Sequence, residues 1–232
     1  MRYRPNWLDF TYEAQFASPV LAFATAPAVV LESMYNTLAP RFPLTTSDLS
    51  VQDDSIVSNV KSKIILFGGN GTIELTADSL GARFNNPIGK GDDKIIQDCI
   101  QLIYDAIAKV KTGVKPKEEK IAVRMFAELL DEPADAMQFL RGLVPVAGMF
   151  ADISESTALA PNIGLVLRDD EEKWDSEFTL ARSVRAKNEF FMTSTTRFFL
   201  GSKYSSLAEK ATKLTSLLNE MMRNRANLHR ST

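Results

Sequence analysis

Hydroxyl and guanidinium side chains alternate along one strand-like segment near the end of this sequence. In residues 190–199, FFMTSTTRFF, the side chains of Thr193, Thr195 and Arg197 share one face, because successive residues of a strand point to opposite faces. We expect the neighbouring strand to add Arg182 to that face. Such a face could bind a small polar anion. It could equally be the plain solvent side of an antiparallel sheet, so both interpretations stay open.

Carboxylates near these arginines support a rival hypothesis, an enzyme that works without histidine. Asp175 and Glu177 precede Arg182, and with Arg197 they could form a carboxylate–arginine site on the second predicted sheet. A concave pocket that contains two or more of these groups with shifted pKa values would favour the enzyme.

Histidine and cysteine are almost absent, which excludes whole classes of chemistry. His229 is the only histidine and Cys99 the only cysteine in 232 residues. An internal disulfide and a two-histidine metal site are impossible within one chain, and a catalytic triad would need His229 as its base. We expect Cys99 to be an inert, buried residue of a helix. We therefore predict no catalytic residue, no metal site and no cofactor.

The overall charge gives no preference for nucleic acid or for an anionic membrane. Lysine and arginine total 27 and aspartate and glutamate 29, for a formal net charge of −2. A nucleic-acid accessory role would depend on local basic residues, and it remains a third and less favoured hypothesis. Those residues are Arg2, Arg4, Arg223, Arg225 and Arg230.

Hydrophobic spacing predicts the elements that position these side chains. The spacing switches between every second residue, typical of strands, and every third or fourth, typical of helices. In the first half we expect a strand at 21–25, a helix from Pro27 to Leu38, strands at 60–67, 72–76 and 82–84, and a helix at 93–110. In the second we expect a strand at 121–127, a short helix that contains Phe139, strands at 163–167, 178–184 and 190–199, and a helix at 205–225.

Two smaller features complete this prediction. Residues 68–71, GGNG, are typical of a hairpin turn, because glycine and asparagine accept positive φ at little cost. Residues 1–17 are rich in aromatic side chains, and we expect an arm that packs on some other surface, which the sequence does not identify.

The fold class that follows is α+β, built as a two-layer sandwich, or two such sandwiches, of mainly antiparallel sheet covered by helices. Both halves read as strand, helix, three strands and long helix, which indicates a tandem β-α-β-β-β-α duplication. This inference depends on element order alone. The charged stretch 111–120, with Gly113 and Pro116, is the expected linker, so we divide the chain into units 1–112 and 113–232, packed separately or as one domain.

The favoured function is non-catalytic binding or assembly through a sheet surface or edge and the C-terminal helix. That helix carries Leu214, Leu218, Met221 and Met222, which we expect to pack on the chain's own sheet or to form an interface. Methionine suits adaptable contacts. We expect a homo-oligomer, or a protein or peptide partner, in the bacterial cytoplasm. The sequence contains no run of about 18 apolar residues, so we predict no transmembrane helix.

Overall fold

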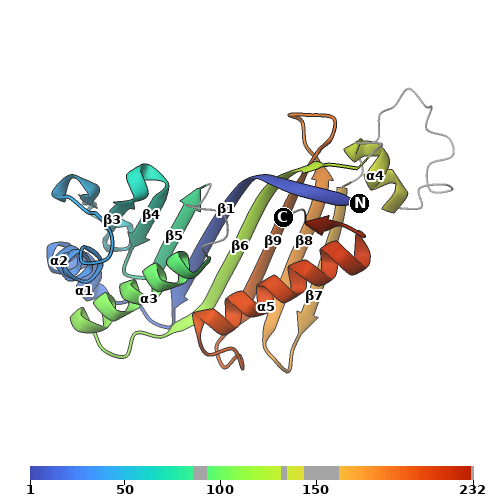
Figure 1. Cartoon of the computed structure of the whole chain (residues 1–232). Helices are drawn as coiled ribbons and strands as arrows, with labels where there is room; N and C mark the ends of the chain where they lie inside the picture. Colours follow the sequence, from blue (N-terminus) through green and yellow to red (C-terminus); the bar gives the residue numbers. More distant parts are fainter. Residues whose placement is uncertain (86–92, 132–134, 144–161, 231–232) are drawn as a thin grey trace.

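One antiparallel sheet runs through the whole of the computed structural model, which describes residues 1–85, 93–131, 135–143 and 162–230. The strand order is β2-β3-β4-β5-β1-β6-β9-β8-β7, and the short β10 pairs with β1 in parallel. Two long helices, α3 and α5, lie on one face of this sheet (Figure 1). No helix in the described ranges has the length and apolar character needed to cross a membrane.

The elements have the following bounds. The strands are β1 (Arg2–Phe16), β2 (Leu49–Gln52), β3 (Lys61–Leu66), β4 (Gly71–Leu75), β5 (Ser79–Asn85), β6 (Pro116–Leu129), β7 (Asn162–Asp169), β8 (Trp174–Arg182), β9 (Glu189–Phe199) and β10 (His229–Arg230). The α-helices are α1 (Leu21–Thr25), α2 (Pro27–Leu38), α3 (Asp93–Val110), α4 (Ala136–Leu143) and α5 (Leu207–Glu220). Short turns are η1 (Thr46–Asp48), η2 (Val57–Asn59), η3 (Phe67–Gly69) and the π-helical η4 (Met221–Arg225).

The predicted fold class is confirmed, and the element order repeats on the two sides of the sheet centre. β1 and β6 pair there, with β5, β4 and β3 beyond β1 and with β9, β8 and β7 beyond β6. Each half closes with one long helix, α3 or α5. The core is shared, because Phe198 and Leu214 of the second half belong to the same buried cluster as Tyr12 and Ile103 of the first. The proposed boundary between residues 112 and 113 remains a prediction.

The spacing of apolar residues explains the covered layer. On β1, Tyr12, Ala14 and Phe16 are buried, whereas Glu13 and Gln15 between them are exposed on the opposite face. On α3 a wide stripe is fully or nearly buried, and it includes the predicted inert thiol. Its members are Ile96, Cys99, Ile100, Ile103 and Ile107. Burial raises the pKa of the Cys99 thiol to about 12, so the thiol stays protonated at neutral pH.

The predictions for the first 25 residues were wrong. The expected arm is β1, which pairs with β5 on one side and β6 on the other. A register shift between Pro5 and Trp7 interrupts the alternation of the strand, and that irregularity also accommodates a proline inside a sheet. Residues 21–25, expected to be a strand, form α1, in keeping with the helix propensity of leucine and alanine.

The structure also tests the predicted linker, the predicted hairpin and the predicted end of the last helix. The predicted linker ends early, because β6 begins at Pro116, a position that a proline can take as the first residue of a strand. The hairpin prediction is confirmed, since η3 joins the antiparallel β3 and β4 and both Gly68 and Gly69 have positive φ. The final α-helix ends at Glu220, and the π-helical turn follows.

Candidate functional site

The four residues predicted to bind an anion lie on two different faces of the sheet. Thr193, Thr195 and Arg197 alternate along β9 on the face away from α3 and α5, and each is half-buried. Arg182 pairs with Phe190 across β8 and β9, and Phe190 is fully buried under the helices. The expectation that Arg182 shares a face with Thr193 is therefore corrected by the register of the two strands.

The charge of Arg197 is already balanced within the chain. Its Nε lies 3.0 Å from Oδ1 of Asp175, and its Nη2 contacts the carboxylate of Glu177. A guanidinium that already pairs with two carboxylates should bind a free anion only weakly. These three residues of the rival enzyme hypothesis do come together, whereas Arg182 does not join them.

The same uncovered face carries charges of both signs in cross-strand pairs. Lys120 Nζ lies 3.1 Å from Glu13 Oε2 between β6 and β1, and Arg83 Nη2 lies 3.9 Å from Asp9 Oδ2 between β5 and β1. Opposite charges on neighbouring strands stabilise a sheet face locally. Acidic side chains therefore lie among the basic ones on the described part of this face, whereas nucleic-acid binding needs a broad basic surface.

Two of the five arginines of the nucleic-acid hypothesis are paired with carboxylates. Arg2 Nη2 lies 2.8 Å from Asp131 Oδ1, and Arg4 Nη2 lies 2.7 Å from Glu128 Oε2. Arg223 is exposed. The side chains of Arg225 and Arg230 are not among those that the structure describes.

The predicted interface stripe of the C-terminal helix faces the chain's own sheet. Leu214, Met221 and Met222 are only 3%, 5% and 4% exposed, and Leu218 is half-buried. Buried side chains cannot contact a partner in this conformation. The alternative expectation, packing on the chain's own sheet, describes the three buried residues, and an intersubunit role for Leu218 remains a prediction.

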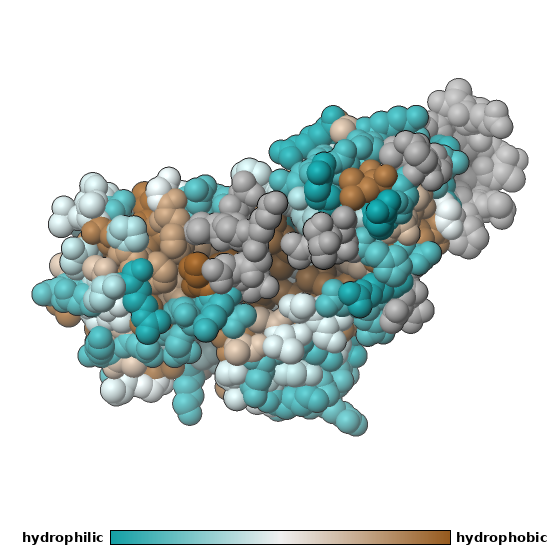
Figure 2. Space-filling view, viewed as in Figure 1, coloured by the Kyte–Doolittle hydropathy of each residue, from teal (hydrophilic) through white to brown (hydrophobic). Residues whose placement is uncertain are grey.

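A cavity of about 180 Å³ lies between α3, α5 and the centre of the sheet. We call it the interhelical cavity. Figure 2 shows apolar residues, in brown, between the more hydrophilic surfaces on this side of the molecule. Residues of three central strands, of both long helices and of η4 form its wall. They are Tyr3, Leu8, Phe10, Ile96, Gln97, Val123, Met125, Met192, Leu207, Ala211, Leu214, Thr215, Leu218, Asn219 and Met222.

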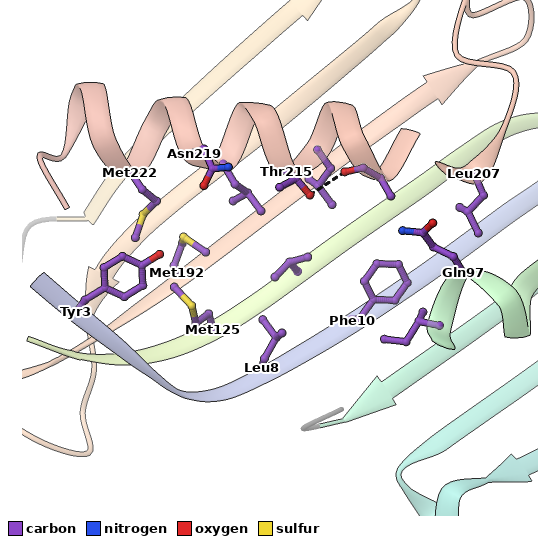
Figure 3. Close-up of a pocket in the computed structure, with 15 residues that line it drawn as sticks. Tyr3, Leu8, Phe10, Gln97, Met125, Met192, Leu207, Thr215, Asn219 and Met222 are labelled. Atoms are coloured by element: carbon purple, nitrogen blue, oxygen red, sulfur yellow. Dashed lines mark hydrogen bonds between the residues drawn. The ribbon is translucent and has the colours of Figure 1, made fainter. Parts of the chain in front are cut away.

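One end of the interhelical cavity is rich in methionine. Met125 and Met192 are direct cross-strand partners on β6 and β9, and Met222 lies just beyond α5 (Figure 3). The phenol of Tyr3 lies beside them in the same view. Thioether side chains are flexible and polarisable, so they adapt their shape to what they contact.

Polar groups in the wall are few and uncharged. The Thr215 hydroxyl donates to the carbonyl of Ala211 at 2.9 Å, so its hydrogen is already used in a bond within the helix. The amides of Gln97 and Asn219 make no hydrogen bond with any part of the chain that the structure describes. Gln97 is half-buried on α3, and Asn219 is exposed on α5.

Next to this cavity, a buried polar network ties both long helices to the sheet. The Tyr12 hydroxyl donates to Glu119 at 2.6 Å and lies 2.7 Å from the Tyr104 hydroxyl of α3. The ammonium of Lys210, on α5, contacts the same Glu119 carboxylate, and the Lys210 side chain is 6% exposed. Burial raises the pKa of both tyrosines, so both hydroxyls stay neutral.

Comparison with known proteins adds little to this geometry. No family model and no curated protein matches the chain. Among solved structures the chain is similar to Methanococcus jannaschii TBP, at 12% identity and a TM-score of 0.33, with 94% of this chain and 97% of that chain covered. Across the described ranges, no group of three or more His, Cys, Asp or Glu side chains is arranged to hold a metal ion.

The interhelical cavity was not predicted from the sequence. Its wall residues follow the apolar spacing of ordinary core positions, and that spacing does not indicate how far apart two helices lie.

Proposed function

We propose that this protein is a non-catalytic binding protein and that the interhelical cavity binds an apolar ligand. The observation that carries the proposal is a cavity of about 180 Å³ whose described wall contains no charged residue. An apolar engineered cavity of about 150 Å³ stays dry and binds benzene. Filling such a space removes apolar ligand surface from water, which stabilises the complex by about 25 cal/mol per Å².

The arrangement of the ionisable groups supports binding over catalysis. Tyr3 is the one ionisable side chain in the described wall. General acid–base chemistry needs a group with a pKa near the working pH, within hydrogen-bond reach of the reacting atom. Asp175, Glu177 and Arg197, the residues of the enzyme hypothesis, pair with one another on the other face of the sheet.

Thermal unfolding in the presence of benzene tests the proposal. We expect benzene to raise the melting temperature, because a ligand that binds only the folded state stabilises it by about 2.7 kcal/mol at a hundred times its Kd. Ala211→Leu places a larger side chain in the cavity wall and should abolish the shift. Ala208→Leu, on the exposed side of the same helix, is the matched control and should keep it. No shift in the wild type with benzene or with the linear alkane hexane would contradict the proposal.

A second candidate function, self-assembly, is favoured by the exposed edge strand β7. β7 ends the strand order of the described sheet, and Leu165, Val166 and Leu167 are 38%, 73% and 36% exposed. The corresponding strand of the first half is β3, whose Ile64 and Leu66 are buried. An uncovered apolar edge strand favours pairing with another strand.

The residue order of β7 suits pairing with a second copy of the chain. In an antiparallel pair centred on Val166, Leu165 of each copy faces Leu167 of the other. Val166→Lys should shift a dimer to the monomer, as measured by light scattering after size-exclusion chromatography. Val184→Lys, at a fully exposed loop position, should leave the mass unchanged. A wild-type monomer at all concentrations would contradict this candidate.

A further inference from the structure

We infer that the ligand of the interhelical cavity is an uncharged, linear amphiphile, such as a medium-chain alcohol, with its alkyl chain along α5 and its polar head at Gln97. The inference rests on the proposed function. It adds the shape, the charge and the orientation of the ligand, and each follows from a different feature of the wall.

The shape follows from how the wall residues are distributed along α5. They form one stripe that runs from Leu207 in the first turn to Asn219 in the last, and Figure 3 shows Leu207 and Met222 at opposite ends of the cavity. Twelve residues of helix rise by about 18 Å. The cavity volume is about 180 Å³. A cavity that is small in volume but extends along most of α5 must be narrow. A linear alkyl chain therefore contacts more of its wall than a compact ring does.

The methionine end made by Met125, Met192 and Met222 suits the flexible end of an alkyl chain, because thioethers adapt to irregular shapes.

The absence of charge follows from the wall and from the pairing of Lys210, a buried cation next to the wall residue Ala211. No described wall residue is charged, so a carboxylate or an ammonium would find no counter-charge among the described wall residues. Lys210 precedes the wall residue Ala211, but its ammonium already pairs with Glu119. An uncharged head therefore fits the site better than an ionised one.

The orientation follows from the position of Gln97. Figure 3 shows its amide at the Leu207 end of the cavity, opposite the methionine end. The amide is half-buried and makes no hydrogen bond within the described part of the chain. An amide has both donors and an acceptor, so it can bond a hydroxyl in either direction.

Isothermal titration of the whole protein with four matched probes tests the shape and the charge. The probes are 1-hexanol, cyclohexanol, hexanoate and hexylammonium, each with six carbons. We expect 1-hexanol to bind at least about tenfold more tightly than the other three, a difference of about 1.4 kcal/mol. Equal binding of cyclohexanol overturns the linear shape, and equal binding of either ion overturns the uncharged head. Both outcomes leave the proposed function standing. If neither 1-hexanol nor cyclohexanol binds, the proposed function fails and this inference with it.

A pair of glutamine variants tests the orientation. Gln97→Met keeps the length of the side chain and removes the amide, so it should weaken 1-hexanol binding about fivefold, as the loss of one hydrogen bond does. Gln101→Met lies one turn further along α3 at an exposed position and should bind 1-hexanol like the wild type. Unchanged affinity in Gln97→Met, with the fold intact by circular dichroism, overturns the placement of the head.

Discussion

The hydroxyl of Tyr12 and the carboxylate of Glu119 meet at 2.6 Å on the covered face of the two central strands. Tyr12 comes from β1 and Glu119 from β6, so the bond joins the two halves of the sheet. Glu119 also accepts from Lys210, which is buried on α5. One carboxylate thereby holds two strands and one long helix in place beside the interhelical cavity.

Neutralising Glu119 should strongly destabilise the fold. Glu119→Gln leaves the Lys210 ammonium buried without its counter-charge, and breaking a buried ion pair in this way costs about 3–5 kcal/mol. Chemical denaturation would measure the loss. The double variant Glu119→Gln, Lys210→Met should recover much of it, because no buried charge then remains. Glu118→Gln, one residue away on the uncovered face, is the control. A similar cost for Glu118→Gln and Glu119→Gln would contradict the explanation.

Glu172 should make the stability fall at acidic pH. Hydrogen bonds from Lys203, then Tyr204 and Trp174, lower the pKa of Glu172 from 4.5 to about 2. A carboxyl with a lowered folded-state pKa stabilises the fold above its unfolded pKa, and this stabilisation is lost as the pH falls from about 4.5 toward about 2. As the pH is lowered from 6 to 2, the free energy of unfolding should therefore fall less steeply for Glu172→Gln than for the wild type. Glu171→Gln should follow the wild-type curve, and an identical slope in both variants would refute the assignment.

Replacing glycine by alanine should cost stability at Gly71 on β4 but not at Gly81 on the neighbouring β5, because only the first position is crowded. A Cβ at Gly71 would lie 3.0 Å from Leu66 Cβ and 3.2 Å from Phe84 Cδ1, whereas a Cβ at Gly81 meets nothing closer than 4.0 Å. Overpacking a core costs about 1–3 kcal/mol. We expect thermal denaturation to show that loss for Gly71→Ala and little change for Gly81→Ala. Equal melting temperatures for the two variants would contradict this account.

The anion site predicted from the sequence can be tested directly. Because Arg197 already pairs with Asp175 and Glu177, phosphate should change the melting temperature of the wild type and of Arg197→Gln by the same amount. Measuring both proteins at constant ionic strength removes the general salt effect. A phosphate-dependent stabilisation that disappears in Arg197→Gln would restore the predicted site.

Sequence patterns predicted the local elements well and the long-range relationships poorly. The isoleucine spacing of α3 gave the helix bounds, and the glycines at 68 and 69 gave the hairpin. β1 was missed because the shift near Pro5 breaks its alternation and its partners are distant in sequence. The face of Arg182 depends on the register between β8 and β9, which neither strand reveals alone. The interhelical cavity depends on helix separation, for which residue spacing holds no information.

The central pairing of β1 with β6 also constrains how the chain is made. Tyr12 pairs with Ile121, so β1 leaves the ribosome long before the strand that covers its second edge. Non-local pairings of this kind slow folding, and unpaired edges promote aggregation in the meantime. A nascent or truncated chain that stops before Pro116 would present to other chains the edge of β1 that β6 covers in the folded protein. Production of this protein should therefore respond to chaperones and to the speed of translation between residues 16 and 116.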